Sequence, residues 1–217
     1  MKAISILNHV LGPIMRGPSS THTAGSFHIG RLARALLGEE PASVTFAFDP
    51  GGSLAEVYRQ QGSDLGFAAG VMGWSITDER FPRALELAAE RGVQIEFTVE
   101  PLATADHPNT VEIRMTSRSG RRLPAVAQSI GGGAVVFTQV DGWPVRLTGD
   151  AHEIVATLEA QAEPAVRELL TRDGQMLGEP VRQVRGDRVA LHVRRQSALA
   201  TEARRQVARL PGVHALW

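Results

Sequence analysis

The stretch Arg16-Gly17-Pro18-Ser19-Ser20-Thr21-His22-Thr23-Ala24-Gly25 joins a run of small and hydroxyl residues to the start of a helical pattern. From about residue 23 to residue 37, apolar side chains recur at the spacing of one helix face. A Ser or Thr of the run is therefore predicted to cap a helix that begins inside this stretch.

Helices and strands alternate after this first helix. Alternating apolar residues predict a strand over residues 44–48, and the turn cluster that follows leads into a helix over residues 53–60. Glycines at positions 62, 66, 70 and 73 fall near one face of a further helix, where two backbones could approach closely. An amphipathic helix is predicted over residues 78–91. Further strands are predicted over residues 93–99, 111–115 and 134–140, with a hairpin tip at residues 118–122.

The last part of the chain reads as a separate unit with the order β-α-β-β-α-β. Its predicted strands are residues 152–158, 178–184, 188–193 and 213–217, and its predicted helices are residues 164–172 and 199–210. This order is the ferredoxin-like arrangement. The predicted fold class is therefore α+β, with a mixed α/β domain over residues 1–147 and a ferredoxin-like βαββαβ domain over residues 148–217.

Composition excludes several kinds of partner and chemistry. The 217 residues include 23 basic and 23 acidic side chains, so the totals indicate neither a nucleic acid nor an anionic membrane as partner. No apolar run approaches the ~20 residues that a membrane helix needs, and polar residues break the N-terminal stretch too early for a signal peptide. We therefore expect a soluble cytoplasmic protein. The chain has no cysteine, which excludes disulfides, a cysteine nucleophile and a Cys-ligated zinc or iron–sulfur site built by this chain alone.

The run from Gly17 to Gly25 is the best candidate for a binding site. Glycine and proline fix a tight backbone, the hydroxyls offer donors and acceptors, and the free N–H groups of a helix start favour a carboxylate or a phosphate. A well-capped helix after a turn is the alternative, although one hydroxyl is enough for a cap and the run has four. His22 titrates near neutrality, so it can bond a carboxylate as imidazolium or accept from an ammonium group when neutral.

Three later loops offer similar chemistry. They are Asp49-Pro50-Gly51-Gly52-Ser53, His107-Pro108-Asn109-Thr110 and Ser129-Ile130-Gly131-Gly132-Gly133, which present accessible N–H groups or polar side chains at turns. His28 lies six residues after His22, which is not the i, i+4 spacing of a helical metal pair, so no metal ligand is predicted. The sequence shows no recognisable set of nucleophile, base and acid, so no catalytic residue is assigned. The residues by themselves indicate a protein that binds a small anionic molecule.

A series of ordered motifs runs through the first domain. They are Gly12-Pro13-Ile14-Met15, Gly17-Pro18-Ser19-Ser20-Thr21-His22-Thr23-Ala24-Gly25, Ile29-Gly30-Arg31 with Ala33-Arg34, Gly52-Ser53-Leu54-Ala55, Gly62-Ser63-Asp64, Asp78-Glu79-Arg80, His107-Pro108-Asn109-Thr110, Ser129-Ile130-Gly131-Gly132-Gly133 and Arg146-Leu147-Thr148-Gly149. Together they resemble the iron–sulfur-dependent L-serine dehydratases, also called L-serine ammonia-lyases, in their β subunit or β domain. Their number and their order make chance coincidence remote.

The resemblance implies a two-chain enzyme that converts L-serine to pyruvate and ammonia. In that family the α subunit carries a 4Fe-4S cluster on cysteines, and the β subunit carries a substrate-binding or allosteric serine-binding fold, often followed by a C-terminal ACT domain. This chain would then be the β subunit, inactive in isolation and without a cofactor of its own. Its partners would be L-serine and a cysteine-containing α subunit, in a homodimeric or heterotetrameric assembly. The residues assigned to binding of serine, as substrate or effector, are Ser19, Ser20, Thr21, His22, Thr23, Gly52, Ser53, His107, Asn109 and Thr110.

Some features depart from the family pattern. His9 stands where relatives usually have an acidic residue, and Thr21 replaces the more common serine but keeps a hydroxyl. In the ACT-like domain, relatives have an Asn-Asp-x-x-Gly type loop after the first strand. Residues 159–164 here read Glu-Ala-Gln-Ala-Glu-Pro, with no glycine to let the backbone approach a ligand. We therefore predict that this domain mainly packs against another chain and binds amino acids poorly or not at all.

Two other functions fit parts of the sequence. The chain could be a stand-alone amino-acid sensor that regulates another enzyme, and the discriminating observation is whether a neighbouring gene encodes a chain with several cysteines. The remaining alternative is a hydrolase that uses His22 and His107 with a metal, which chelator treatment would test.

Overall fold

A computed structural model describes residues 16–217 of the chain, which divide after Thr148 into two compact units. The expectations for residues 1–15, including those for His9 and for the motif at 12–15, lie outside the described residues. Both units combine helices with a β-sheet, which confirms the α+β class. Within residues 16–217, none of the helices is long and apolar enough to cross a lipid bilayer.

The first unit contains a six-stranded sheet with the order β2-β1-β3-β4-β5-β6. Its strands are β1 (Pro41–Phe48), β2 (Gln94–Val99), β3 (Thr110–Ser117), β4 (Arg122–Gly131), β5 (Ala134–Val140) and β6 (Trp143–Leu147). β1 and β2 run parallel, and the other neighbours are antiparallel. Phe48 pairs with Val111, and Val111 pairs with Ala127. The end of β1, the start of β3 and the end of β4 therefore meet at one end of the sheet.

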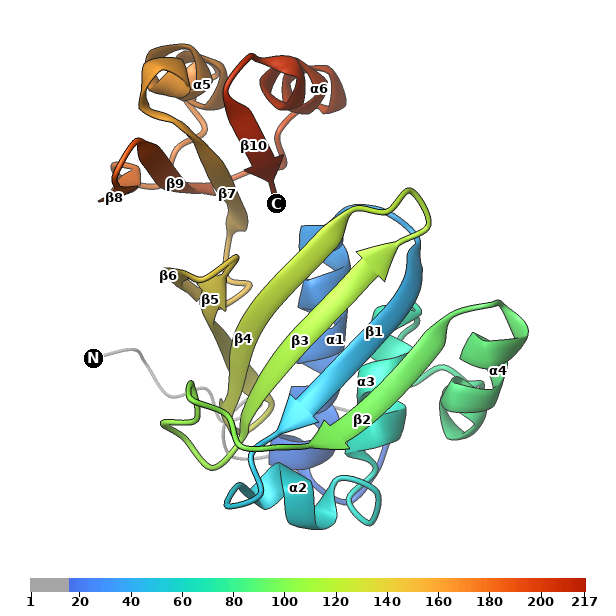
Figure 1. Cartoon of the computed structure of the whole chain (residues 1–217). Coiled ribbons are helices and arrows are strands. Elements are labelled where there is room, and N and C mark those ends of the chain that lie inside the picture. Colours follow the sequence, from blue (N-terminus) through green and yellow to red (C-terminus); the bar gives the residue numbers. More distant parts are fainter. Residues whose placement is uncertain (1–15) are drawn as a thin grey trace. The chain divides into compact units, whose positions relative to one another are not determined.

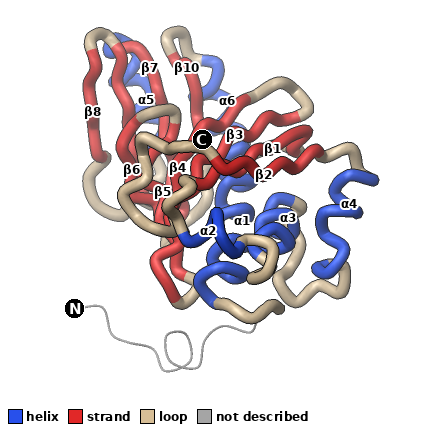
Figure 2. Tube along the Cα trace, turned by 60° about the horizontal axis from the view of Figure 1, so that its bottom comes forward, coloured by secondary structure: helices blue, strands red, loops and turns tan. Residues whose placement is uncertain are grey.

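Helices α1 (Gly25–Leu37) and α3 (Ser63–Val71) lie side by side against one face of this sheet (Figure 1 and Figure 2). Aromatic rings form part of the core beneath them. The ring centroid of Phe46 lies 4.2 Å from that of Phe67 in α3 and 5.7 Å from that of Phe97 in β2. The shorter elements are α2 (Ser53–Val57), the 3-10 turn η3 (Phe81–Arg83) and α4 (Ala84–Glu90).

The first helix begins earlier than the sequence pattern predicts. A π-helical turn, η2 (Ser20–Ala24), precedes α1 and runs directly into it. The turn is wide because the N–H groups of Thr23 and Ala24 both donate to the Ser19 carbonyl, at 2.8 and 3.3 Å. The Ser19 hydroxyl accepts the His22 N–H at 3.1 Å. A serine therefore caps the helix as predicted, but through a π turn that residue spacing does not reveal.

The predicted close approach of two backbones is found between α1 and α3. A Cβ on Gly66 would lie 2.5 Å from the Thr23 carbonyl oxygen, and one on Gly70 would lie 2.3 Å from the Phe27 carbonyl oxygen. The other two glycines of the series have φ angles of +64° and +70° and lie at the ends of α3. The spacing of four therefore reflects helix contact at two positions and helix termination at the other two.

Three elements of the first unit differ from the sequence prediction. Strand β4 covers residues 122–131, where no strand was predicted. The helix expected over 78–91 becomes α-helical only at Ala84, because Pro82 has no N–H to donate and the Asp78 carboxylate accepts the Arg80 N–H. Strand β6 was also not predicted, and it contains Pro144, a residue that is disfavoured inside a sheet. It forms at the edge of the sheet, where proline is tolerated, after a two-residue turn with φ angles of +50° and +73°.

The second unit has the predicted order of elements. They are β7 (His152–Glu159), the 3-10 turn η4 (Ala160–Ala162), α5 (Glu163–Thr171), β8 (Val181–Arg185), β9 (Arg188–Arg195), α6 (Thr201–Arg209) and β10 (Val213–Leu216). The sheet is antiparallel, with the order β10-β7-β9-β8. Val166 and Leu170 of α5 and Val207 of α6 join apolar strand residues in one buried cluster. The fully buried Arg195 donates to the Leu170 carbonyl near the end of α5 and pairs with Asp173.

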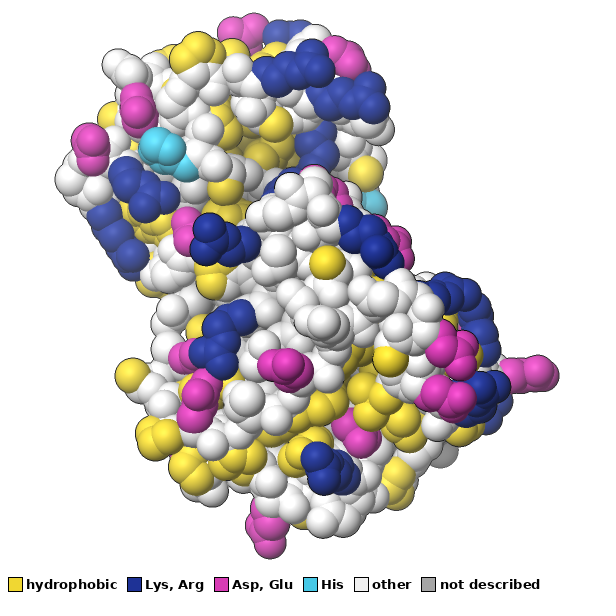
Figure 3. Space-filling model, turned by 45° about the vertical axis from the view of Figure 1, so that its right-hand side comes forward, with side chains coloured by type: hydrophobic (Ala, Val, Ile, Leu, Met, Phe, Trp, Pro, Cys, Tyr) yellow, Lys and Arg dark blue, Asp and Glu magenta, His cyan; other side chains and the backbone are white. Residues whose placement is uncertain are grey.

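Basic and acidic side chains are interspersed over the face of the molecule drawn in Figure 3, in keeping with the balanced charge totals. Several form exposed ion pairs, among them Arg34 with Glu40 and Arg83 with Glu86. Solvent screens such pairs, so they contribute little to stability. Burial of apolar side chains inside each unit therefore contributes more to its stability than these surface ion pairs do.

Candidate functional site

Four segments meet at the end of the first unit's sheet where β1 ends and β3 begins. They are the turn that starts η2, the turn at 49–53 after β1, the turn at 107–110 before β3 and the end of β4. Hydrogen bonds join these segments to one another. The four motifs that the sequence indicated as binding loops are thus brought into one place.

His22 lies at the centre of a chain of hydroxyl groups. Its Nδ1 lies 3.1 Å from Ser19 Oγ, and its Nε2 lies 2.9 Å from Ser53 Oγ. Partial burial lowers the pKa of His22 below its usual 6.5, so the imidazole is neutral at neutral pH. A neutral imidazole has one donor and one acceptor, which gives each of these hydrogen bonds a direction. The centre of the cluster is therefore polar and uncharged.

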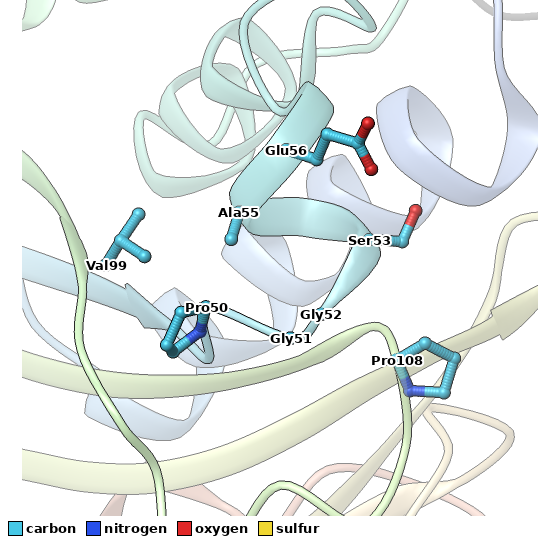
Figure 4. Close-up of a pocket in the computed structure, with 8 residues that line it drawn as sticks. All are labelled: Pro50, Gly51, Gly52, Ser53, Ala55, Glu56, Val99 and Pro108. Atoms are coloured by element: carbon cyan, nitrogen blue, oxygen red, sulfur yellow. The ribbon is translucent and has the colours of Figure 1, made fainter.

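The turns at 49–53 and 107–110 are locked together beside His22. The Ser53 N–H donates to the Pro108 carbonyl at 2.8 Å, and a Cβ on Gly52 would lie 2.9 Å from the same oxygen. An open hollow of about 580 Å³ adjoins this junction; its lining residues are Pro50, Gly51, Gly52, Ser53, Ala55, Glu56, Val99 and Pro108 (Figure 4). In Figure 4 the Ser53 hydroxyl and the Glu56 carboxylate both point away from the side of the hollow where Pro50 lies.

Asp49 organises the first of these turns. Its carboxylate accepts the N–H groups of Leu102 and Gly51, each at 2.9 Å. These two hydrogen bonds hold the pKa of Asp49 below its usual value, so the side chain is an anion at neutral pH. Asp49 therefore holds in place the turn whose residues 50–53 line the hollow.

The end of β4 holds the η2 turn through Ser129. The Ser129 hydroxyl donates to the Thr21 carbonyl at 2.6 Å, and its N–H donates to the Asn109 carbonyl at 3.2 Å. Ser129 is 1% exposed, and its Oγ lies 2.1 Å from the place that a Cβ would take on Gly25. The sequence indicated backbone N–H groups in this loop and missed the serine side chain. A contact between residues 21 and 129 has no local signal in the sequence.

Several predicted site residues are engaged within the protein. Thr23 is buried, and its hydroxyl donates to the Gln61 carbonyl at 2.6 Å. His107 accepts the Asn109 N–H on Nδ1 at 3.1 Å, within its own turn. Asn109 Oδ1 and Thr110 Oγ1 are buried and have no hydrogen-bond partner among the described residues. Buried polar atoms are usually paired, so these two acceptors are candidates for a ligand donor.

Ser20 and Thr21 contribute main-chain groups. The Ser20 carbonyl accepts the Gly25 N–H, and the Thr21 carbonyl accepts the Ser129 hydroxyl. Both side chains are partly exposed. The side chains of Ser19, His22 and Ser53 are thus hydrogen-bonded to one another. Ser20 and Thr21 contribute carbonyl groups to the hydrogen bonds nearby.

Glu56 is a second residue that sequence reasoning missed. It is exposed on α2, three positions after Ser53, and it lines the same hollow. Residues three apart lie on one face of a helix, so this spacing was the available signal. Glu56 adds a negative charge beside the uncharged cluster.

Metal ligands are not grouped in the described part of the chain. Within residues 16–217, no three His, Asp or Glu side chains lie together so as to hold a metal ion. The chain also has no cysteine, and cysteine thiolates are the usual ligands of an iron–sulfur cluster. The donor set of this chain therefore does not fit such a cluster.

The turn after β7 in the second unit has its backbone donors in use. The Glu159 N–H donates to the Gly212 carbonyl at 2.7 Å, and the Ala160 N–H donates to the Asp187 carbonyl at 3.0 Å. The following residues close as η4. The N–H groups of Glu159 and Ala160 are thus bonded within the unit.

The fold and the cluster define an α+β protein of two units whose first unit holds a histidine between two serine hydroxyls. No protein-family model matches the chain. It is 41% identical to the probable L-serine dehydratase beta chain of Bacillus subtilis (strain 168) over 155 residues, 71% of this chain and 68% of that protein. It is 33% identical to the L-serine dehydratase beta chain of Peptoniphilus asaccharolyticus over 146 residues, 67% of this chain and 65% of that protein. The chain belongs to the family of L-serine dehydratase beta chains, which confirms the resemblance.

Proposed function

We propose that the chain is the β subunit of an iron–sulfur-dependent L-serine dehydratase, which converts L-serine to pyruvate and ammonia together with an α subunit. The observation that carries this proposal is the hydrogen-bonded cluster around His22 in a member of the beta-chain family. The isolated chain would bind serine but would not turn it over.

A serine molecule has groups complementary to the cluster. Its carboxylate accepts hydrogen bonds, and the Ser53 hydroxyl can donate one. Its ammonium group is attracted by a carboxylate, and Glu56 lines the hollow beside Ser53. Asn109 Oδ1, buried and unpaired in the described part of the chain, adds an acceptor for the ammonium or for the serine hydroxyl. A zwitterionic amino acid therefore suits the site better than a simple anion.

The iron–sulfur chemistry belongs to the partner in this proposal. In the family the 4Fe-4S cluster supplies the Lewis acid that removes the serine hydroxyl, and this chain has no cysteine to ligate it. A cysteine-containing α subunit would hold the cluster, and no residue of this chain is assigned a catalytic role. The bound serine is then either substrate in transit or an effector. For an effector, a coupling of about 1–3 kcal/mol to the α-subunit site is expected.

The second unit is proposed to assemble chains rather than to bind an amino acid. The bonded N–H groups of Glu159 and Ala160 support this role, because an ACT-like ligand turn needs free backbone donors. A homodimer or a heterotetramer would result.

An anaerobic pull-down of the tagged full chain from its native cells tests the proposal. We expect a brown complex that forms pyruvate from L-serine, beside a colourless and inactive isolated chain. Glu56→Gln in that complex should raise the serine concentration needed for half-maximal rate, whereas Glu79→Gln, which removes an exposed carboxylate elsewhere, should not. Capture of a different enzyme without iron would contradict the proposal and favour an amino-acid sensor.

A further inference from the structure

We propose that Ser53 donates the hydrogen bond by which the site selects a carboxylate, and that His22 is a neutral positioning residue that holds Ser53 for this role. The inference rests on the proposed function, since the carboxylate in question is that of L-serine. It assigns the ligand contact to a hydroxyl group rather than to the imidazole.

A count of donors and acceptors leaves one hydroxyl proton unused in either tautomer of His22. Ser19 Oγ accepts the His22 backbone N–H at 3.1 Å, and its own proton has His22 Nδ1 within reach at 3.1 Å. With that proton donated to Nδ1, the neutral ring carries its hydrogen on Nε2 and donates it to Ser53 Oγ at 2.9 Å. In the opposite tautomer the unused proton belongs to Ser19, which does not line the hollow, whereas in the first it belongs to Ser53, which does. We infer the first arrangement because a ligand in the hollow can then accept the remaining proton.

Ser53 is then left with one unused donor. Its oxygen accepts from His22, and its backbone N–H is taken by the Pro108 carbonyl at 2.8 Å. The hydroxyl proton remains, at the border of the hollow that Ser53 lines. A carboxylate can accept this proton, whereas an ammonium group cannot. Chains of hydrogen bonds polarise one another, so the bond from His22 makes the Ser53 hydroxyl a stronger donor.

The position of Glu56 supports the same orientation of the ligand. Glu56 lies three residues after Ser53 and lines the same hollow, so a zwitterion would direct its carboxylate to Ser53 and its ammonium to Glu56. Both ring nitrogens of His22 are occupied by hydroxyls, so the imidazole reaches a ligand only through them. The lowered pKa of His22 agrees with a ring that stays neutral while it holds Ser53.

Calorimetric titration of the full chain with L-serine and with L-serinamide, which lacks the carboxylate, tests the role of Ser53. We expect the native chain to prefer L-serine and Ser53→Ala to lose about tenfold or more of its affinity for L-serine, as for a hydrogen bond to a charged group. L-serinamide binding should change little in that variant. Ser53→Thr keeps a hydroxyl and should keep the preference, and Ser75→Ala, which removes an exposed hydroxyl elsewhere, should match the native chain.

The tautomer of His22 is a second and independent readout. Long-range proton–nitrogen NMR of histidine-labelled chain should show a hydrogen on Nε2 and a bare Nδ1. His22→Gln, whose amide nitrogen can replace Nε2, should bind L-serine more tightly than His22→Asn. A hydrogen on Nδ1, or equal losses for both probes in Ser53→Ala, would overturn the inference while the serine site stands. A native chain that binds neither probe would overturn the proposed serine site itself.

Discussion

The contact between Gly25 and Ser129 allows a sharp test of how the site is built. An alanine Cβ at position 25 would lie 2.1 Å from Ser129 Oγ and 2.9 Å from Ser129 Cβ. Atoms cannot remain at these distances, so in Gly25→Ala the serine must rotate away and the helix must shift. The rotation breaks the buried hydrogen bond from Ser129 to the Thr21 carbonyl.

The expected loss of stability has three parts. An unmade buried hydrogen bond costs about 1–3 kcal/mol. Overpacking of a closed contact costs about 1–3 kcal/mol. Alanine has a higher helix propensity than glycine, which stabilises the folded chain by roughly 1 kcal/mol. We therefore expect Gly25→Ala to lower the free energy of unfolding of the first unit by about 3 kcal/mol.

Urea denaturation can measure this effect for the first unit alone. In a Trp217→Phe background the tryptophan fluorescence comes from Trp74 and Trp143, which both lie in the first unit. Ser129→Gly removes the clashing atoms, so the double variant Gly25→Ala/Ser129→Gly should be about 1–2 kcal/mol more stable than the sum of the single effects predicts. Additive single effects, or a Gly25→Ala chain as stable as the native one, would refute this reasoning about the site.

Three further outcomes are expected. Gly70→Ala should destabilise the first unit by about 2 kcal/mol, because its Cβ would lie 2.3 Å from the Phe27 carbonyl oxygen; Gly51→Ala, in an exposed turn, should leave the urea midpoint unchanged. L-serine affinity should be constant above pH 6.5, because the lowered pKa of His22 keeps the ring neutral there while its Nε2–H holds Ser53; calorimetry across pH checks this, and affinity that falls as the pH rises above 6.5 would contradict it. Arg195→Met should destabilise the second unit by about 2–4 kcal/mol, since a buried carbonyl loses its donor, as thermal unfolding would show.

The sequence predicted the elements of the fold well where the signals are local. The alternation at 44–48, the serine cap of the first helix and the order of elements in the second unit all depend on residues a few positions apart. The π turn of η2 escaped prediction because it depends on two N–H groups sharing the Ser19 carbonyl. Strand β6 escaped because the local effect of Pro144 was outweighed by pairing with β5.

The candidate site was predicted in part for the same reason. Ser19, His22 and Ser53 were each singled out by residue type and by their place at a turn or a helix start. Ser129 and Glu56 were missed, since one acts across the sheet and the other through a helix face beside a hollow. Residue type suggested which loops can bind a polar molecule, but not which of their atoms remain free for it.

The sequence by itself therefore determined the family, the α+β class and the loops that carry the polar residues. Motifs, periodicity and turn residues depend on positions that are close together in the chain, so they can be recognised without the structure. Only the tertiary structure decided which groups meet. His22 and Ser53 are 31 positions apart, and Thr21 and Ser129 are 108 positions apart. Such pairs come together through strand register and the close packing of α1 on α3, which are properties of the folded chain as a whole.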